Sequence, residues 1–198
     1  MKDLFIAVPN MGKIASELVR DLLLWRHKYP DLPVMFMSYQ NPVVYARNLI
    51  IKEFLKTKGQ YLMMIDADQT VPLSFLEMSD FEFDIISPKI NIIKQFELIP
   101  MILEKKDNGE YGLIQDYSKG GIVEVDAVGS GCMMIKRAIL ETMPPPWFEY
   151  RFDETGDMPI GNDFLFCQKA KELGYKIWVH TGIVSSHFRE IDLAILGG

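Results

Sequence analysis

The stretch YLMMIDADQTVP, residues 61–72, places two carboxylates directly after an apolar run. The run is typical of a buried strand, and side chains two positions apart in a strand point to the same side, as Asp66 and Asp68 then do. Two carboxylates that close repel each other unless a cation compensates their charge. A divalent ion, Mg2+ or Mn2+, bound together with substrate phosphates would supply this compensation. The alternative is a pair of solvated acids that cap the following turn.

Alternating helices and strands surround this pair. Asn41 is expected to cap a helix that begins at Pro42 and ends at Gly59. Apolar patterns predict a helix over 13–28, a short helix over 73–78, and strands over 3–9, 34–39, 60–67 and 84–90. This alternation indicates a parallel α/β sheet, in which ligands bind beyond the carboxyl ends of the strands. The two aspartates lie at such an end.

The second half of the chain has a different character. Asn108 and Gly109 between two apolar stretches, 99–105 and 111–117, predict an antiparallel hairpin. Further strands are expected over 123–128, 132–137 and 176–180, and a helix over 162–173. Asn162 is the expected N-cap of that helix and Gly174 the residue that ends it. No linker is visible, so we expect one domain over residues 1–198.

Composition excludes some classes of function. The chain has 198 residues, 48% of them hydrophobic, which is typical of a soluble globular protein. Its net charge is -6 and no basic stripe is present, so nucleic acid is not an expected partner. No stretch approaches the roughly 20 apolar residues of a transmembrane helix, and the N-terminus does not resemble a signal peptide. Cys132 and Cys167 are far apart, which indicates reduced core residues of a cytoplasmic protein.

The order of several short motifs resembles that of the GT-A glycosyltransferases, in particular small family-two-like members of bacterial and phage type. The resemblance covers nearly the whole chain. Its motifs are AVPN at the first strand, ARN (46–48), MMIDADQTVP, VDAVGSGCMMIKR (125–137), PPPWF (144–148), GNDFLFCQKAKELGYKIWV (161–179) and SSHF (185–188).

The resemblance implies a Rossmann-like GT-A fold with a mainly parallel sheet and a small antiparallel portion. Residues 1–90 would form the nucleotide-sugar-binding half, and residues 91–198 the acceptor and catalytic half. The implied reaction moves a sugar from a nucleoside-diphosphate sugar to a hydroxyl of a glycan or other acceptor. Asp66, Asp68 and His187 match the family's metal-binding positions, with His180 as a rival histidine. One imidazole among carboxylates suits Mn2+ somewhat better than Mg2+.

Asp163 matches the family's general base, and a single displacement with this base would invert the sugar. Its place in the first turn of a helix is expected to lower its pKa, because a helix N-terminus stabilises an anion. The alternative is a helix-start residue without a catalytic role. The family usually has Glu-Asp here, so Asn162 departs from the pattern, and we expect it to bind acceptor hydroxyls.

Other matched positions are assigned to the two substrates. Gly129, Ser130 and Gly131 are expected to form a tight turn that allows close approach of a ligand. Trp147 either stacks on an acceptor sugar or covers the core. Together with Asp66 and the glycine turn, the expected donor-binding residues are Pro9, Arg47 and Asn48. The acidic residue that often reads uracil is missing, since Tyr39, Gln40 and Asn41 follow the second strand.

Two other functions fit parts of the sequence. DADQT matches the DxDxT motif of haloacid dehalogenase-like phosphatases, although two βα units precede it here. Asn162 favours a catalytically silent module that binds sugar nucleotides without transferring the sugar.

Overall fold

The computed structural model describes residues 3–94, 97–114, 116–158 and 160–189. Its helices are α1 (Ser16–Lys28), α2 (Val43–Leu55), α3 (Leu73–Leu76), the 3-10 helix η1 (Glu77–Asp80), α4 (Arg137–Thr142) and α5 (Asn162–Glu172). Its strands are β1 (Leu4–Asn10), β2 (Val34–Ser38), β3 (Tyr61–Ile65), β4 (Gln69–Thr70), β5 (Ile85–Lys94), β6 (Glu97–Pro100), β7 (Leu103–Lys105), β8 (Tyr111–Leu113), β9 (Ile122–Val125), β10 (Cys132–Lys136) and β11 (Ile177–His187).

A mixed sheet crosses the part of the chain that the structure describes. Its strands follow the order β2-β1-β3-β10-β5-β11-β4, with β6 added beside β5 and β9 beside β11. Strands β2, β1 and β3 are mutually parallel, and β11 is parallel to β5. The carboxyl ends of these strands therefore meet at one edge of the sheet, as the βα alternation predicts.

Strand β10 lies between β3 and β5 and is antiparallel to both. The sequence pattern predicts 84–90 as the next strand of the parallel series and does not predict this insertion. All residues from Cys132 to Ile135 are buried, and a strand that is apolar on both faces is stable only in the middle of a covered sheet. Because β10 is antiparallel, its first residue Cys132 pairs with Ile65, the last residue of β3.

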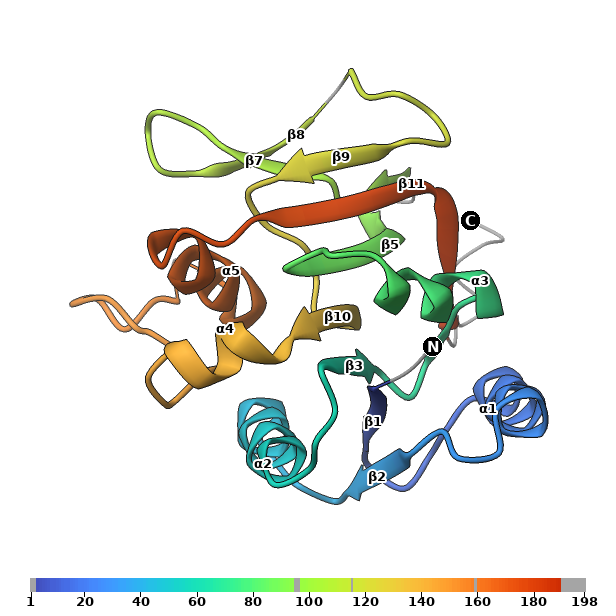
Figure 1. The fold of residues 1–198 in the computed structure, drawn as a ribbon. Helices are drawn as coiled ribbons and strands as arrows, with labels where there is room; N and C mark the ends of the chain where they lie inside the picture. The colour runs from blue at the N-terminus through green and yellow to red at the C-terminus, as the bar shows by residue number, and fades with distance from the viewer. Residues whose placement is uncertain (1–2, 95–96, 115, 159, 190–198) are drawn as a thin grey trace, which may run out of the picture.

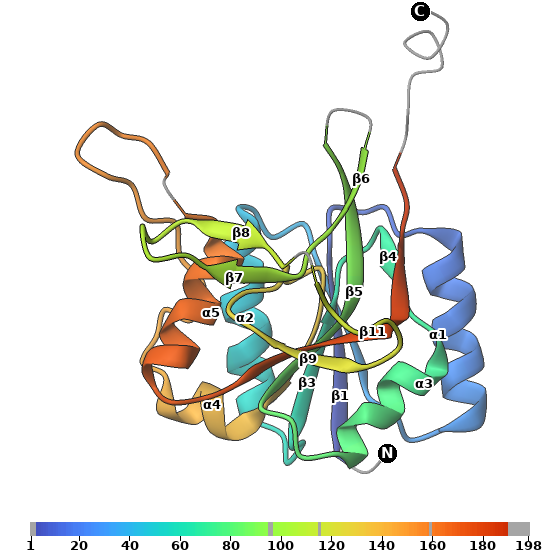
Figure 2. The ribbon, with the colours of Figure 1, turned by 90° about the horizontal axis from the view of Figure 1, so that it is seen from above.

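Helices cover both faces of the sheet (Figures 1 and 2). Helices α2, α4 and α5 lie on one face, and α1 and α3 lie on the other. Each face has its own apolar cluster, one around Phe54, Phe148 and Phe166 and the other around Leu18, Trp25 and Phe75. The two cysteines are free and buried, and they belong to different clusters.

Several predicted boundaries shift by a few residues. Helix α1 begins at Ser16 rather than at residue 13, because the N–H of Ala15 donates to the carbonyl of Ala67 at 2.8 Å and holds the preceding segment as a loop. The N-cap of α2 is Pro42 rather than Asn41. The predicted hairpin at Asn108 and Gly109 is confirmed, with β7 and β8 antiparallel and Gly109 at φ +85°.

Strand β11 is longer than predicted and includes most of the expected tail. Its register against β5 shifts between His180 and Val184. Beyond the shift, Ser186 and His187 pair with Thr70 and Gln69 of β4. Only this long-range pairing brings the end of β11 beside the segment that contains Asp66 and Asp68.

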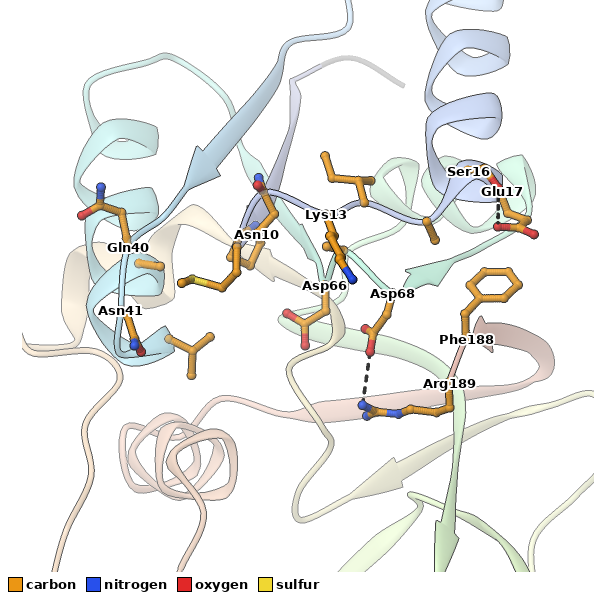
Figure 3. Close-up of a pocket in the computed structure, with 17 residues that line it drawn as sticks. Asn10, Lys13, Ser16, Glu17, Gln40, Asn41, Asp66, Asp68, Phe188 and Arg189 are labelled. Atoms are coloured by element: carbon orange, nitrogen blue, oxygen red, sulfur yellow. Dashed lines mark hydrogen bonds and ion pairs between the residues drawn. The ribbon is translucent and has the colours of Figure 1, made fainter. Parts of the chain in front are cut away.

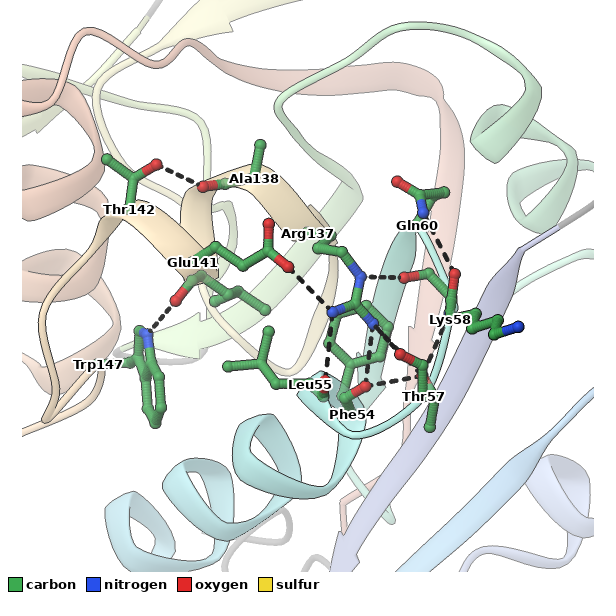
Figure 4. Close-up of polar contacts among 12 residues, drawn as sticks. Phe54, Leu55, Thr57, Lys58, Gln60, Arg137, Ala138, Glu141, Thr142 and Trp147 are labelled. Atoms are coloured by element: carbon green, nitrogen blue, oxygen red, sulfur yellow. Dashed lines mark hydrogen bonds and ion pairs between the residues drawn. The ribbon is translucent and has the colours of Figure 1, made fainter.

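The partly buried guanidinium of Arg137 packs against the carboxyl end of α2 (Figure 4). It donates to the carbonyl oxygens of Phe54 at 3.1 Å, Thr57 at 2.9 Å and Gly59 at 2.5 Å. The same group lies over the Phe54 ring, 4.6 Å from its centroid. Carbonyls at a helix end lack partners within the helix, and Arg137 donates to one of them, that of Phe54, and to the carbonyls of Thr57 and Gly59 in the segment just after α2.

In the described residues, no helix is both long and apolar enough to span a bilayer.

Candidate active site

A cavity of about 920 Å³ lies at the carboxyl ends of β1, β2 and β3 (Figure 3). Its wall includes Asp66 and Asp68 after β3 and Gln40 and Asn41 after β2. Pro9, an expected donor-binding residue, also lines it. The cavity therefore lies where ligands bind in open α/β sheets.

Asp66 is fixed by backbone and side-chain contacts at the end of β3. Its N–H donates to the carbonyl of Gly131 at 2.7 Å. Its two carboxylate oxygens lie 3.2 and 3.3 Å from Nη2 of Arg47. This ion pair already supplies one cation to the aspartate pair.

Arg47 connects two segments that are far apart in the sequence. Its guanidinium is buried, and Nη1 donates to Oδ1 of Asn162 at 2.9 Å. It also lies 5.6 Å from the centroid of the Phe148 ring. Within the described part of the chain, Nε of Arg47 has no hydrogen-bond partner. Arg47 thus joins Asp66 on the cavity wall to the first residue of α5.

Asp68 faces His187, the last residue of β11, and Arg189, which lies just beyond that strand. Oδ2 of Asp68 lies 3.5 Å from Nε2 of His187 and 3.3 Å from Nη1 of Arg189. The N–H of Phe188 also donates to the carbonyl of Asp68 at 2.8 Å. The structure therefore brings the expected ligands Asp68 and His187 together.

The hydrogen bonds of His187 fix its role toward a cation. Nδ1 lies 3.2 Å from the carbonyl oxygen of Asn91, which can only accept, so Nδ1 carries the proton. In the neutral ring Nε2 then presents a lone pair, and this buried atom has no hydrogen-bond partner among the described residues, although Oδ2 of Asp68 lies 3.5 Å away. An imidazole whose other nitrogen donates to a carbonyl is the usual arrangement of a metal ligand.

A complete protein metal site is not preformed in the described residues. No group of three or more His, Cys, Asp and Glu side chains there is arranged to hold an ion. Asp66 is engaged by Arg47, which leaves Asp68 and His187 as a pair. Two protein ligands fit an ion that takes its other oxygens from substrate phosphates and water.

The rival histidine, His180, lies before the register shift of β11. Its Nδ1 accepts the N–H of Ile183 at 3.1 Å, and it pairs with Ile122 of β9. Neither of these contacts involves Asp66 or Asp68.

Asp163 is half-buried in the first turn of α5. Burial raises the pKa of its carboxyl above the usual value, against the lowering effects of Arg47 and of the backbone N–H groups of Phe164 and Ser130. The expected lowering of the pKa is therefore wrong, because desolvation outweighs the helix N-terminus. The expected N-cap is also wrong, since Gly161 occupies that position and Asn162 is the first helical residue.

Gly129, Ser130 and Gly131 form a connection from β9 to β10, and these strands are not neighbours in the sheet. One end of this connection, Gly129, lies near Asp163, and the other end, Gly131, lies near Asp66. A Cβ on Gly129 would lie 3.8 Å from Oδ2 of Asp163, and one on Gly131 would lie 3.1 Å from Oδ2 of Asp66 and overlap Nε2 of Gln69. At residue 131 only glycine allows this close approach.

Asn48 and Trp147 contact each other rather than the cavity. Oδ1 of Asn48 accepts the N–H groups of Trp147 at 3.0 Å and Phe148 at 3.2 Å. Nδ2 of Asn48 donates to carbonyls of Val44 and Phe148, both at 2.7 Å. Trp147 is buried, and its indole N–H donates to Leu140 at 2.8 Å. The sequence allowed Trp147 either to stack on an acceptor sugar or to cover the core, and in the structure its ring covers the core.

Two cations at the cavity were not identified from the sequence. Lys13 lies in the loop after β1, and Arg189 follows the SSHF motif. Arg189 lies two residues beyond the end of β11, so strand alternation does not reach it, and its place directly after the SSHF motif is the one local signal that could have found it. Lys13 has no local signal, since a lone lysine in a loop is most often a solvated charge.

Comparisons with known proteins support the fold. No protein-family profile matches the sequence, and no characterised protein matches it at the sequence level. In structure the chain is similar to A197 from STIV, with a TM-score of 0.67 and 19% identity over 94% of this chain and 86% of that one. It is also similar to GalNAc-T7 crystallised with UDP, GalNAc and Mn2+, with a TM-score of 0.59 and 14% identity over 96% of this chain. For TarS 1-349 of S. aureus in complex with UDP, the TM-score is 0.51 and the identity 16% over 92% of this chain.

These similarities define the class of the fold. The chain has the GT-A fold of nucleotide-diphospho-sugar transferases, with a mostly parallel central sheet and some antiparallel strands. It spans 45% of GalNAc-T7 and 60% of the TarS chain, and the identities are low.

Proposed function

We propose that this protein is a metal-dependent glycosyltransferase that moves a sugar from a nucleoside-diphosphate sugar to a hydroxyl acceptor with inversion. The observation that carries the proposal is Asp68 on the cavity wall with His187 beside it: Nε2 of His187 lies 3.5 Å from Oδ2 of Asp68, is buried, and has no hydrogen-bond partner in the described residues. The UDP in GalNAc-T7 and TarS, and the Mn2+ in GalNAc-T7, support the same donor class and cation for this fold.

Asp68 and His187 are the residues that would hold the cation, and Mn2+ suits a carboxylate with an imidazole. Once bound there, such an ion neutralises the negative charge that develops on the departing diphosphate. Asp66 also lies on the wall of the donor site, where the ion pair with Arg47 stabilises its ionised carboxylate. Pro9 and the connection from Gly129 to Gly131 complete the donor side.

Asp163 is the proposed general base. As the acceptor oxygen bonds to the anomeric carbon and the bond to the diphosphate breaks, the Asp163 carboxylate takes the hydroxyl proton. Burial raises the pKa of the Asp163 carboxyl, which makes it a stronger base, while the nearby guanidinium of Arg47 and the N–H of Ser130 act in the opposite direction and favour its ionised form. Asn162 keeps one lone pair and its N–H groups for acceptor hydroxyls while it accepts from Arg47.

The other functions considered make different predictions. A phosphatase would need Asp66 as a free nucleophile, whereas both of its oxygens face Arg47. A binding module without activity is favoured by Asn162 alone.

The test is release of nucleoside diphosphate from UDP-GalNAc, UDP-glucose and GDP-mannose in the presence of Mn2+. We expect release by the wild-type protein and a loss of about 10²- to 10⁴-fold in Asp163→Asn, the usual contribution of a general base. Asp68→Asn should respond to Mn2+ only at higher concentrations. Asp107→Asn, an exposed acid in the β7–β8 turn, is the matched control and should behave as wild type.

Each of the other outcomes would point to a different function or remove one assignment. Nucleotide binding without release or transfer would indicate the binding module. Phosphate release from p-nitrophenyl phosphate would indicate the phosphatase. Full activity of Asp163→Asn would remove the assigned base.

A further inference from the structure

Lys13 is an exposed side chain in the loop between β1 and α1, on the wall of the cavity. Figure 3 shows its amine directed into the cavity, on the side where Asp66 and Asp68 lie. No hydrogen bond or ion pair involves its Nζ in the part of the chain that the structure describes. A cation aimed into a cavity without a partner is available to a ligand.

The loop that carries Lys13 is held at both ends. Before it, the carbonyl of Asn10 accepts the N–H of Tyr39 at 2.8 Å, and Oδ1 of Asn10 accepts the N–H of Gly12 at 3.1 Å. After it, Ala15 donates to Ala67 at 2.8 Å, between the two aspartates.

Gly12 strengthens this constraint. It has φ +88°, and a side chain there would overlap the Tyr39 ring. The backbone of Lys13 is therefore positioned in advance, which reduces the entropy lost when its side chain orders on a ligand.

The charges of the cavity wall indicate that Lys13 is available to a negatively charged ligand. The ionisable residues of the wall are Lys13, Arg189, Glu17, Asp66 and Asp68, so two positive and three negative charges leave a net charge of -1. Arg189 is paired with Asp68, and Asp66 is paired with Arg47 from outside the wall. Lys13 is the wall cation whose charge no described carboxylate takes up.

We propose that Lys13 binds the diphosphate of the donor, with its Nζ donating hydrogen bonds to phosphate oxygens. This inference rests on the proposed function and adds a residue to its donor site. Lys13 comes from the loop after β1, whereas Asp68 follows β3 and Arg189 follows β11. A diphosphate would therefore be held by groups from separate segments, by Lys13 and by the cation site at Asp68.

The experiment compares four proteins: wild type, Lys13→Met, Lys13→Arg and Lys58→Met. Lys58 is an exposed lysine at the other end of the sheet, so Lys58→Met has the same net charge as Lys13→Met without altering the cavity. Binding of ADP, CDP, GDP, UDP and dTDP is measured by calorimetry with Mn2+, at low and at high NaCl concentration.

We expect Lys13→Met to weaken binding of the preferred diphosphate about tenfold, as for one hydrogen bond to a charged group. Lys13→Arg should stay within about threefold of wild type, since it keeps the charge. The affinity of wild type should fall more with salt than that of Lys13→Met, because an exposed charge contact is screened. Lys58→Met should match wild type.

The possible failures are distinguishable. If the wild type binds a diphosphate and Lys13→Met binds it equally well with the same salt dependence, the role of Lys13 is wrong and the proposed function stands. If no diphosphate binds to the wild type, the proposed function is wrong and Lys13 has no such role.

Discussion

Replacing Arg137 by methionine should destabilise the protein through the carboxyl end of α2. Methionine keeps an unbranched apolar stem that can remain against Phe54. It removes the donors that reach the carbonyls of Phe54, Thr57 and Gly59. It also removes the positive charge from the negative end of the helix dipole.

The size of the effect follows from these contacts. The side chain of Arg137 is only 11% exposed, so water replaces its hydrogen bonds incompletely. A hydrogen bond from a charged group contributes about 1.5–3 kcal/mol, and a partly buried cation at a helix end contributes up to about 2 kcal/mol. We therefore expect Arg137→Met to lower the free energy of unfolding by about 2–4 kcal/mol. For a protein of this length each kcal/mol lowers Tm by about 2–4 °C, so the loss should be about 5–15 °C.

Thermal unfolding followed by circular dichroism measures this loss. Arg137→Lys keeps the charge but not the planar set of donors, and its Tm should lie about halfway between those of the wild type and Arg137→Met. The matched control is Arg20→Met, since Arg20 is 64% exposed and pairs with its neighbour Asp21. That change should alter stability by no more than about 0.5 kcal/mol. Equal Tm values for Arg137→Met and Arg20→Met would refute the capping role.

Three further predictions concern the candidate site. Because burial raises the pKa of Asp163, its ionised form destabilises the folded state above that pKa and the penalty is absent below the unfolded pKa. Asp163→Asn should therefore gain Tm relative to wild type as pH rises from about 4 to 7, and an unchanged difference would contradict this cause. His187→Gln should raise the Mn2+ concentration required for half-maximal donor cleavage about 10- to 100-fold, whereas His180→Gln should leave it unchanged. Equal effects of the two changes would contradict the choice of His187. Gly131→Ala should reduce activity at least tenfold by displacing Gln69 and Asp66, whereas Gly129→Ala should have less than threefold effect. Equal activities of the two glycine variants would show that the close approach of residue 131 to Gln69 and Asp66 is not needed for activity.

The sequence predicted the features that depend on neighbouring residues. Asn108 and Gly109 specify their hairpin, and Gly174, with φ +88°, ends α5 as expected. The apolar run before Asp66 forms β3, and the cavity lies at its carboxyl end. Each of these signals lies within a few residues of the structure it predicts, so backbone conformation and local burial suffice to read it.

Other features depended on partners that local patterns do not identify. The antiparallel insertion of β10 follows from burial on both faces of the sheet. The start of α1 at Ser16 follows from a hydrogen bond to Ala67. The raised pKa of Asp163 follows from how much of the chain covers it, and the helix position alone gave the opposite sign.

The amino-acid sequence by itself determined the order of helices and strands, the placing of Asp66 and Asp68 at a strand end, and the resemblance to a GT-A fold. Only the tertiary structure decided that Asp68 faces His187 while Asp66 faces Arg47, and that Trp147 is buried. The physical reason is that periodicity and turn chemistry act over a few residues. Contacts between distant segments are set by the packing and pairing of the whole sheet.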